Sequence, residues 1–154
     1  MGGASLSRHQ IVAALWPLPH SEHRLHAGQT FPKSERLQHG HEFRAVYERG
    51  RKAVGRLAVL YVVDESMEPM GENKRGKREG SGVGVVTGRA IGGAVQRNRA
   101  RRLLREAYRL NKHKLKPSLR MVMVARTAIA GKPFSDVETE LLNLFRTAGI
   151  LIEP

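Results

Sequence analysis

Apolar residues recur along this chain at spacings that predict helices and strands, and they concentrate after position 40. Helical spacing joins four of them: Leu37, Phe43, Val46 and Tyr47. Gly50 follows, so we expect a short helix that ends at this glycine. The continuous run 57–63 is rich in β-branched and aromatic residues, which predicts a strand buried on both faces.

The second half of the chain alternates between the two patterns. Residues 83–87 predict a second strand, the Gly-rich run 88–93 predicts a turn, and residues 94–115 predict a helix that Pro117 closes. Residues 119–125 predict a third strand. These elements make a strand, helix, strand unit.

A final amphipathic pattern predicts the last helix. Ser135 and Glu138 have the spacing of a capping box at its start, and Gly149 ends it. The order helix, strand, strand, helix, strand, helix predicts an α+β domain in which helices pack on a small sheet.

In two segments the apolar residues follow neither a helical nor a strand period. Residues 1–33 mix Gly, Pro and His, and residues 64–82 carry many charges among Gly and Pro. We expect a poorly ordered N-terminal extension and a flexible charged loop. The folded domain is then 34–152, and a chain of 154 residues fits one such domain.

The charge of the chain is large and localised. Lys and Arg number 27 against 14 Asp and Glu, which gives +13 at pH 7. Residues 94–116 contain six Arg, three Lys and one Glu, and so carry +8 of this charge. A charge of this kind is typical of proteins that bind a polyanion, and nucleic acid is the leading partner.

On the predicted helix these charges share one face. At about 100° per residue, six side chains fall within an arc of about 100°: Asn98, Arg101, Arg102, Arg105, Arg109 and Lys112. A basic face can be merely solvated, but here like charges at i, i+3 and i+4 repel one another with few acids to offset them. Because Arg outnumbers Lys and grips phosphate with a planar fork, we favour binding to shaped RNA or DNA.

Two neighbouring features allow two interpretations each. The glycines of 88–93 either expose backbone N–H groups to a phosphate or only make a tight turn, and no Gly-Lys-Ser/Thr of a nucleotide-binding loop follows them. Phe43 and Tyr47 lie four residues apart on one helical face. They either belong to the core or stack on unpaired bases.

The sequence contains no catalytic arrangement in its predicted folded part. No Ser, His and Asp set and no metal-ligand spacing appears there. The absence of cysteine excludes a thiolate nucleophile and fits a cytoplasmic protein. No apolar run approaches the roughly 20 residues that span a bilayer, so we expect no membrane association.

The run from Ala94 to Glu106 resembles the signature of the bacterial ribonuclease P protein subunit, Ala-Val-x-Arg-Asn-Arg-x-(Lys/Arg)-Arg-x-x-Arg-Glu, throughout. The segment before Gly50 is similar to the first helix of that family, and 57–63 to its first strand. The likeness covers about residues 31–151. It departs at Ala90 and Gly93, where the family usually has Lys and Asn.

The resemblance implies a fold and an activity. The fold is like domain 2 of ribosomal protein S5, a small mixed sheet with helices and a left-handed crossover. The activity is maturation of the 5′ end of precursor tRNA by one catalytic RNA and one protein. The RNA carries the chemistry and holds most of the Mg²⁺, and no protein partner or catalytic residue of the protein is implied.

The resemblance also implies two binding surfaces. The surface for the catalytic RNA comprises Arg89, Arg97, Asn98, Arg99, Arg101, Arg102, Arg105 and Arg109. The cleft for the single-stranded 5′ leader comprises Phe43, Tyr47 and Arg56. The alternative is a structural RNA-binding protein, ribosomal or an assembly component, which shares charge and fold but needs no leader cleft.

Overall fold

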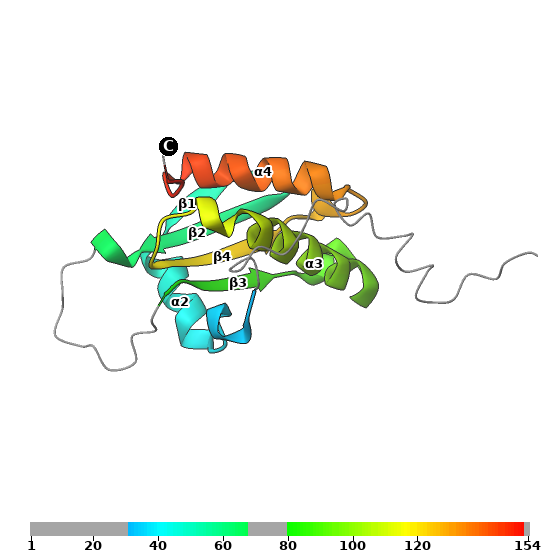
Figure 1. Cartoon of the computed structure of the whole chain (residues 1–154). Coiled ribbons are helices and arrows are strands. Elements are labelled where there is room, and N and C mark those ends of the chain that lie inside the picture. Colours follow the sequence, from blue (N-terminus) through cyan, green and yellow to red (C-terminus); the bar gives the residue numbers. More distant parts are fainter. Residues whose placement is uncertain (1–30, 68–79, 153–154) are drawn as a thin grey trace, which may run out of the picture.

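A four-stranded sheet with three α-helices forms the part of the chain that the computed structural model describes, residues 31–67 and 80–152 (Figure 1). The elements are α2 (Gly40–Arg49), β1 (Arg51–Val54), β2 (Ala58–Asp64), β3 (Gly82–Val86), α3 (Ala94–Asn111), β4 (Leu119–Ala125) and α4 (Phe134–Thr147). The predicted α+β class with a small mixed sheet is confirmed.

The strands lie in the order β1-β2-β4-β3. β1 pairs with β2 and β2 with β4 in antiparallel fashion, whereas β3 and β4 are parallel neighbours joined through α3. In Figure 1 both parallel strands run to the right, β4 lies above β3 and α3 crosses in front of them. The crossover is therefore left-handed, against the usual preference for right-handed βαβ connections.

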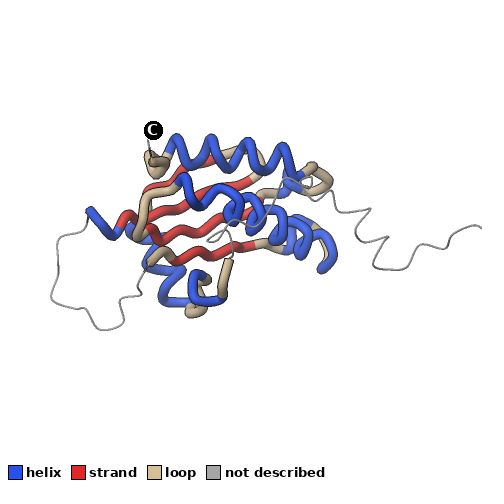
Figure 2. Tube along the Cα trace, viewed as in Figure 1, coloured by secondary structure: helices blue, strands red, loops and turns tan. Residues whose placement is uncertain are grey.

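The two faces of the sheet are covered differently (Figure 2). α3 and α4 lie on one face, where Leu119, Met121 and Met123 of β4 join the main core. α2 covers part of the other face, over a smaller cluster that contains Val46 and Val122. Successive β4 side chains reach opposite clusters because strand side chains alternate between faces.

One strand was missed by the sequence pattern, and another is less buried than predicted. β1 buries only Ala53, and the exposed Arg51 and Lys52 interrupt its apolar pattern. The prediction that 57–63 is buried on both faces is wrong, because β2 alternates between buried and half-buried residues. The half-buried ones, such as Tyr61, lie on the face that α2 covers only in part.

The two terminal helices start at other residues than expected. Leu37 precedes α2, and its N–H donates to the Val83 carbonyl at 2.9 Å, so this residue extends the sheet instead of the helix. The capping box predicted at Ser135 is wrong, because α4 begins at Phe134 with no side-chain cap. Glu138 instead accepts a hydrogen bond from the Asn111 side chain at 2.9 Å.

The folded unit extends slightly beyond the predicted boundaries. The Phe31 ring packs edge-on against Tyr108 with centroids 5.2 Å apart, so residues 31–33 belong with the domain. At the charged loop, Asp64 ends β2 and Glu65–Met67 form a 3-10 helix. The rest of the predicted extension and loop, 1–30 and 68–79, lies outside the described residues. No helix in the described ranges is long and apolar enough to cross a membrane.

Candidate nucleic-acid interface

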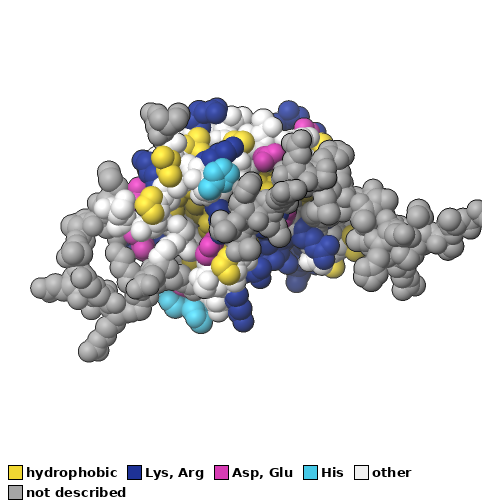
Figure 3. Space-filling model, viewed as in Figure 1, with side chains coloured by type: hydrophobic (Ala, Val, Ile, Leu, Met, Phe, Trp, Pro, Cys, Tyr) yellow, Lys and Arg dark blue, Asp and Glu magenta, His cyan; other side chains and the backbone are white. Residues whose placement is uncertain are grey.

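The arginine surface predicted from the sequence is on α3. Seven of the eight predicted RNA-binding residues lie in this helix, and Arg89 lies in the 3-10 helix η3 (Arg89–Ile91) just before it. The opposite side of α3, with Leu103, Leu104 and Ala107, is buried in the core. Figure 3 shows Lys and Arg side chains gathered in the region that α3 and β3 occupy in Figure 1.

The first half of this surface is held by neutral partners. Arg101 donates to Thr87 Oγ1 at 3.0 Å and to Asn98 Oδ1 at 3.4 Å. Arg99 donates to the Lys132 carbonyl at 3.0 Å. These bonds orient the guanidinium groups without cancelling their charge, which leaves it for an anionic partner.

The second half of the surface is paired with acids. Arg109 forms an ion pair with Glu106 one turn earlier. Lys112 pairs with Glu35 at 2.9 Å. The sequence grouped Arg109 and Lys112 with the other basic residues, but the structure gives both an acidic partner, so these two charges are offset within the fold.

Arg105 is crowded by like charge. Its guanidinium is partly buried, and burial, followed by Arg36 and Arg101, lowers its pKa. Its Nε atom is buried without a hydrogen-bond partner among the described residues. Arg36 precedes the signature by some sixty residues, and charge spacing on one helix could not have revealed it.

An aromatic surface lies on the α2 side of the sheet. The Tyr47 ring meets the Tyr61 ring edge-on, with centroids 4.9 Å apart and planes at 87°. Lys52 Nζ lies 5.7 Å from the Tyr61 centroid. Tyr47 is 40 % exposed, and partial burial, followed by Tyr61, raises its pKa. Exposed rings beside a cation can stack with bases and contact phosphates.

Phe43 lies deeper than Tyr47. It is partly buried against the smaller core cluster and packs over Gly84 of β3. A Cβ atom at Gly84 would lie 2.3 Å from Phe43 Cε1, so only glycine lets the ring lie this close to the strand. Phe43 therefore builds the floor on this side, and Tyr47 supplies the accessible ring.

Arg56, the third predicted cleft residue, is elsewhere. It lies in the turn between β1 and β2, where the Glu140 carboxylate of α4 accepts hydrogen bonds from the Arg56 and Leu57 N–H groups at 2.5 and 2.6 Å. Tyr61 lies five positions further along the chain, about 16 Å away at 3.3 Å per residue of extended chain. The structure thus does not bring Arg56 to Tyr47, and it adds Tyr61 and Lys52, which the sequence did not single out.

The glycines before α3 make a tight turn. Gly92 has φ 142° and ψ −157°, a conformation that L side chains rarely adopt. The start of α3 has no side-chain cap and no acid in its first turn. The two interpretations of this loop, a tight turn and backbone N–H groups open to a phosphate, therefore do not exclude each other.

Within the described ranges no three His, Cys, Asp or Glu side chains gather into a metal site. The arrangement combines positive charge on α3 with aromatic rings across the sheet, and such groups can bind an anionic polymer.

Solved structures share this fold. The Staphylococcus aureus RNase P protein superposes with a TM-score of 0.64, covering 78 % of this chain and 100 % of that one, at 18 % identity. The RNase P protein of Thermotoga maritima superposes with a TM-score of 0.59 over 78 % of this chain and 99 % of that one, at 25 % identity. The architecture is that of bacterial RNase P proteins.

Sequence comparison is more specific. Residues 31–149 match the family model for Ribonuclease P. The ribonuclease P protein component of Clostridium acetobutylicum is 37 % identical over 120 residues, 78 % of this chain and 93 % of the relative. The ribonuclease P protein component of Clostridium perfringens is 38 % identical over 114 residues, which cover 74 % of this chain and 88 % of the relative. The chain belongs to the ribonuclease P protein family, whose members are parts of an RNA–protein endoribonuclease.

Proposed function

We propose that this chain binds the catalytic RNA of ribonuclease P through the first half of α3 and the 5′ leader of precursor tRNA across the α2 side of the sheet. The RNA carries out hydrolysis, and the protein holds RNA and leader together and reduces the repulsion between their phosphates. The protein works in the cytoplasm. The observation that carries the proposal is the run of arginines from Arg97 to Arg105, which contains no acidic residue.

The binding of RNA through α3 follows from how this run is held. Arg99 and Arg101 form hydrogen bonds to a carbonyl and a hydroxyl, so their positive charge is fixed in place, and these two partners are neutral. Fixed guanidinium forks match phosphate oxygens and lose little side-chain entropy on binding.

The leader surface follows from the rings across the sheet. A single-stranded leader has unpaired bases, and stacking on an exposed ring tolerates any base sequence. Tyr47 offers such a ring, and Lys52 lies near enough to its neighbour Tyr61 to meet a leader phosphate. This combination suits an enzyme whose substrates share a 5′ extension but differ in its sequence.

We propose that the RNA carries out the chemistry and that it holds most of the Mg²⁺ ions of the assembled enzyme.

Reconstitution tests the proposal. We expect purified protein alone to leave precursor tRNA intact, and protein with the catalytic RNA and Mg²⁺ to cleave it at the 5′ end of the mature tRNA. Arg101→Gln should weaken binding to the catalytic RNA, whereas Arg146→Gln on α4, with the same loss of charge, should not. Turnover by RNA-free protein, or equal effects of the two variants, would contradict it. If the protein has only a structural RNA-binding role, precursor tRNA with and without the 5′ leader should bind equally well.

A further inference from the structure

A largely buried arginine, Arg120 of β4, belongs to neither of the binding surfaces above. Its side chain is only 12 % exposed and meets carboxylates from two other elements. Arg120 Nε lies 2.8 Å from Glu65 Oε1 in the 3-10 helix after β2, and Nη1 lies 3.8 Å from Glu42 Oε1 of α2. Both acids are also largely buried. One planar guanidinium group thus joins the sheet to two segments that pack on it.

Arg120 lies on the same face of the sheet as α2. Side chains alternate along a strand, so Arg120 shares this face with Val122, which belongs to the core cluster under α2. Val122 is paired in the sheet with Tyr61. The arginine is therefore two residues along β4 from the position opposite the ring that Tyr47 contacts.

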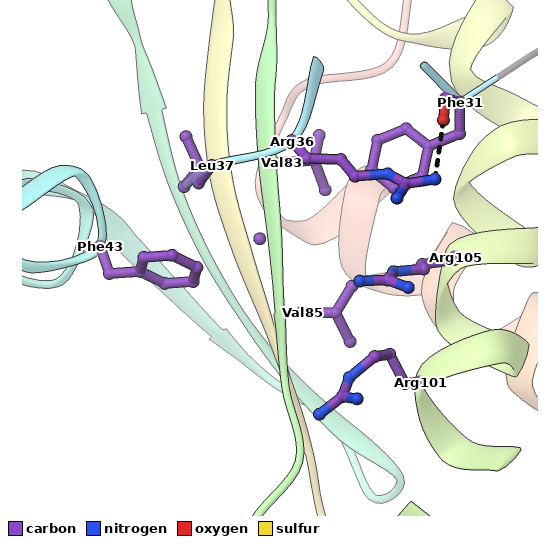
Figure 4. Close-up of a pocket in the computed structure, with 9 residues that line it drawn as sticks. Phe31, Arg36, Leu37, Phe43, Val83, Val85, Arg101 and Arg105 are labelled. Carbon is purple, nitrogen blue, oxygen red and sulfur yellow. Dashed lines mark hydrogen bonds between the residues drawn. The ribbon is translucent and has the colours of Figure 1, made fainter. Parts of the chain in front are cut away.

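The helix α2 depends on the sheet for its place. It has ten residues, of which only Val46 is fully buried, and helices this short are marginal in water without tertiary contacts. Phe43 points from α2 toward β3 and packs over Gly84 (Figure 4). The ion pair between Glu42 and Arg120 adds a contact at the first turn of the helix.

Glu42 uses its two carboxylate oxygens differently. Oε2 accepts hydrogen bonds from the N–H groups of Gln38 and His39, at 2.8 and 3.0 Å, and so stabilises the start of the helix. Oε1 faces Arg120. Glutamine at this position can keep the first role with its side-chain oxygen, because Glu and Gln both cap helices from here, but it has no charge for the ion pair. One substitution therefore separates the two roles.

We propose that Arg120 is a positioning residue: through Glu42 it holds α2 on the sheet, and so fixes the Tyr47 ring beside Tyr61. Tyr47 follows Glu42 by five residues, about 7.5 Å along the helix, so a tilt of the helix at Glu42 moves the ring. Because both partners of the ion pair are largely buried, salt screens it little. The anchoring of α2 can be measured without RNA, whereas its effect on the 5′ leader rests on the proposed function.

Hydrogen exchange of the full chain without RNA measures the anchoring. In Glu42→Gln, the amides of α2 should exchange about 2- to 10-fold faster than in the wild type, while those of α3 and α4 keep their rates. Glu65→Gln is the matched control. It removes the shorter ion pair of the same arginine but leaves the contact with α2, so α2 should keep its rates. Faster exchange of α2 in both variants alike, or in neither, would overturn the proposal.

Substitution of the arginine tests whether Glu42 acts through it. Arg120→Gln should speed α2 exchange at least as much as Glu42→Gln does, and the double variant should exchange no faster, because the ion pair is already gone. If Arg120→Gln does not fold, Arg120→Lys replaces it in the same comparison, since it keeps the charge but not the planar fork that reaches both acids. Effects that simply add would show that Glu42 holds α2 without Arg120, against the proposal.

Binding of precursor and mature tRNA to the reconstituted holoenzyme tests the effect on the leader. Glu42→Gln should lower the ratio of the two affinities about 3-fold, because a displaced Tyr47 ring stacks less well, and mature tRNA should bind as before. Glu65→Gln should keep the wild-type ratio. Equal losses for both RNAs would make Arg120 a purely structural residue and overturn its positioning role.

Failure of the proposed function would give a different result. If the wild type shows no preference for precursor tRNA with a leader, leader binding is wrong. The exchange rates of α2 then decide alone whether Arg120 anchors the helix.

Discussion

At the scale of single residues, Tyr47 distinguishes leader binding from packing. Tyr47→Leu keeps an apolar side chain and removes the ring, so it should cost roughly 1 to 3 kcal/mol of affinity for precursor tRNA with a 5′ leader. Mature tRNA should bind as before, because it has no leader to stack. Affinities of the holoenzyme for both RNAs measure the difference.

The outcome for stability is equally informative. Because Tyr47 is 40 % exposed and contacts Tyr61 only at its edge, Tyr47→Leu should change the Tm little. A large drop in Tm, with equal losses for both RNAs, would make Tyr47 a core residue. Tyr47→Phe is the matched control, since it keeps the ring and should keep most of the leader preference.

Tyr108 gives a pH dependence whose sign can be worked out. Burial, the Glu35 charge and a 3.4 Å hydrogen bond to Glu35 all raise the pKa of the Tyr108 hydroxyl above its ordinary value of 10. Above about pH 10 the unfolded chain loses this proton and the folded one keeps it, so stability falls as pH rises.

Tyr108→Phe should make that alkaline decline shallower by up to about 1.4 kcal/mol per pH unit, the value for one proton. It retains the ring that packs against Phe31. Urea unfolding between pH 8 and 11.5 measures both slopes. Parallel slopes for variant and wild type would show that the hydroxyl ionises alike in both states.

At the scale of the helix, removing one positive charge from α3 should affect RNA binding differently at different positions. Arg101→Gln removes an uncompensated charge and should flatten the salt dependence of binding to the catalytic RNA by up to about 0.9. Arg109→Gln should change it less, because Glu106 already offsets that charge. Binding titrations from low to high KCl compare the two. Equal slopes would mean that the Glu106 pair opens when RNA binds.

The helices also show what sequence patterns can and cannot predict. β4 was predicted with its observed bounds, because Leu119–Ala125 is apolar except for Arg120. α3 was predicted from one helical period of apolar and basic residues, but the prediction ran to residue 115, whereas the helix ends at Asn111 and Lys112–Lys114 form a 3-10 helix. β1 has neither signal, since it is short, charged and at the edge of the sheet. The α3 arginines follow from spacing along one element, whereas Arg36, Lys52 and Tyr61 come to their sites from other elements.

At the scale of the whole molecule, the N-terminal boundary of the fold can be tested by truncation. Removal of residues 1–29 should leave the Tm nearly unchanged, because that sequence has no core-forming pattern. Removal of residues 1–37 should lower it clearly, since it takes away the Phe31 contact with Tyr108, the Glu35 partner of Lys112 and the buried Leu37.

The buried Leu37 alone corresponds to about 1.5 to 3 kcal/mol, or several degrees in a domain of this size. Scanning calorimetry of the two truncated proteins gives the answer. A large loss on removing residues 1–29 would mean that the segment contributes to stability after all.

The two edges of the sheet have a consequence for solubility. Unpaired strand edges are where copies of a protein add to one another and aggregate, and charged side chains along an edge oppose this. Exposed Arg51 and Lys52 lie on β1, the outer strand at one edge, and Arg101 and Arg105 flank β3 at the other. A second copy would therefore bring like charges together at either edge. Positive charge at both edges should therefore oppose edge-to-edge aggregation of newly made chains.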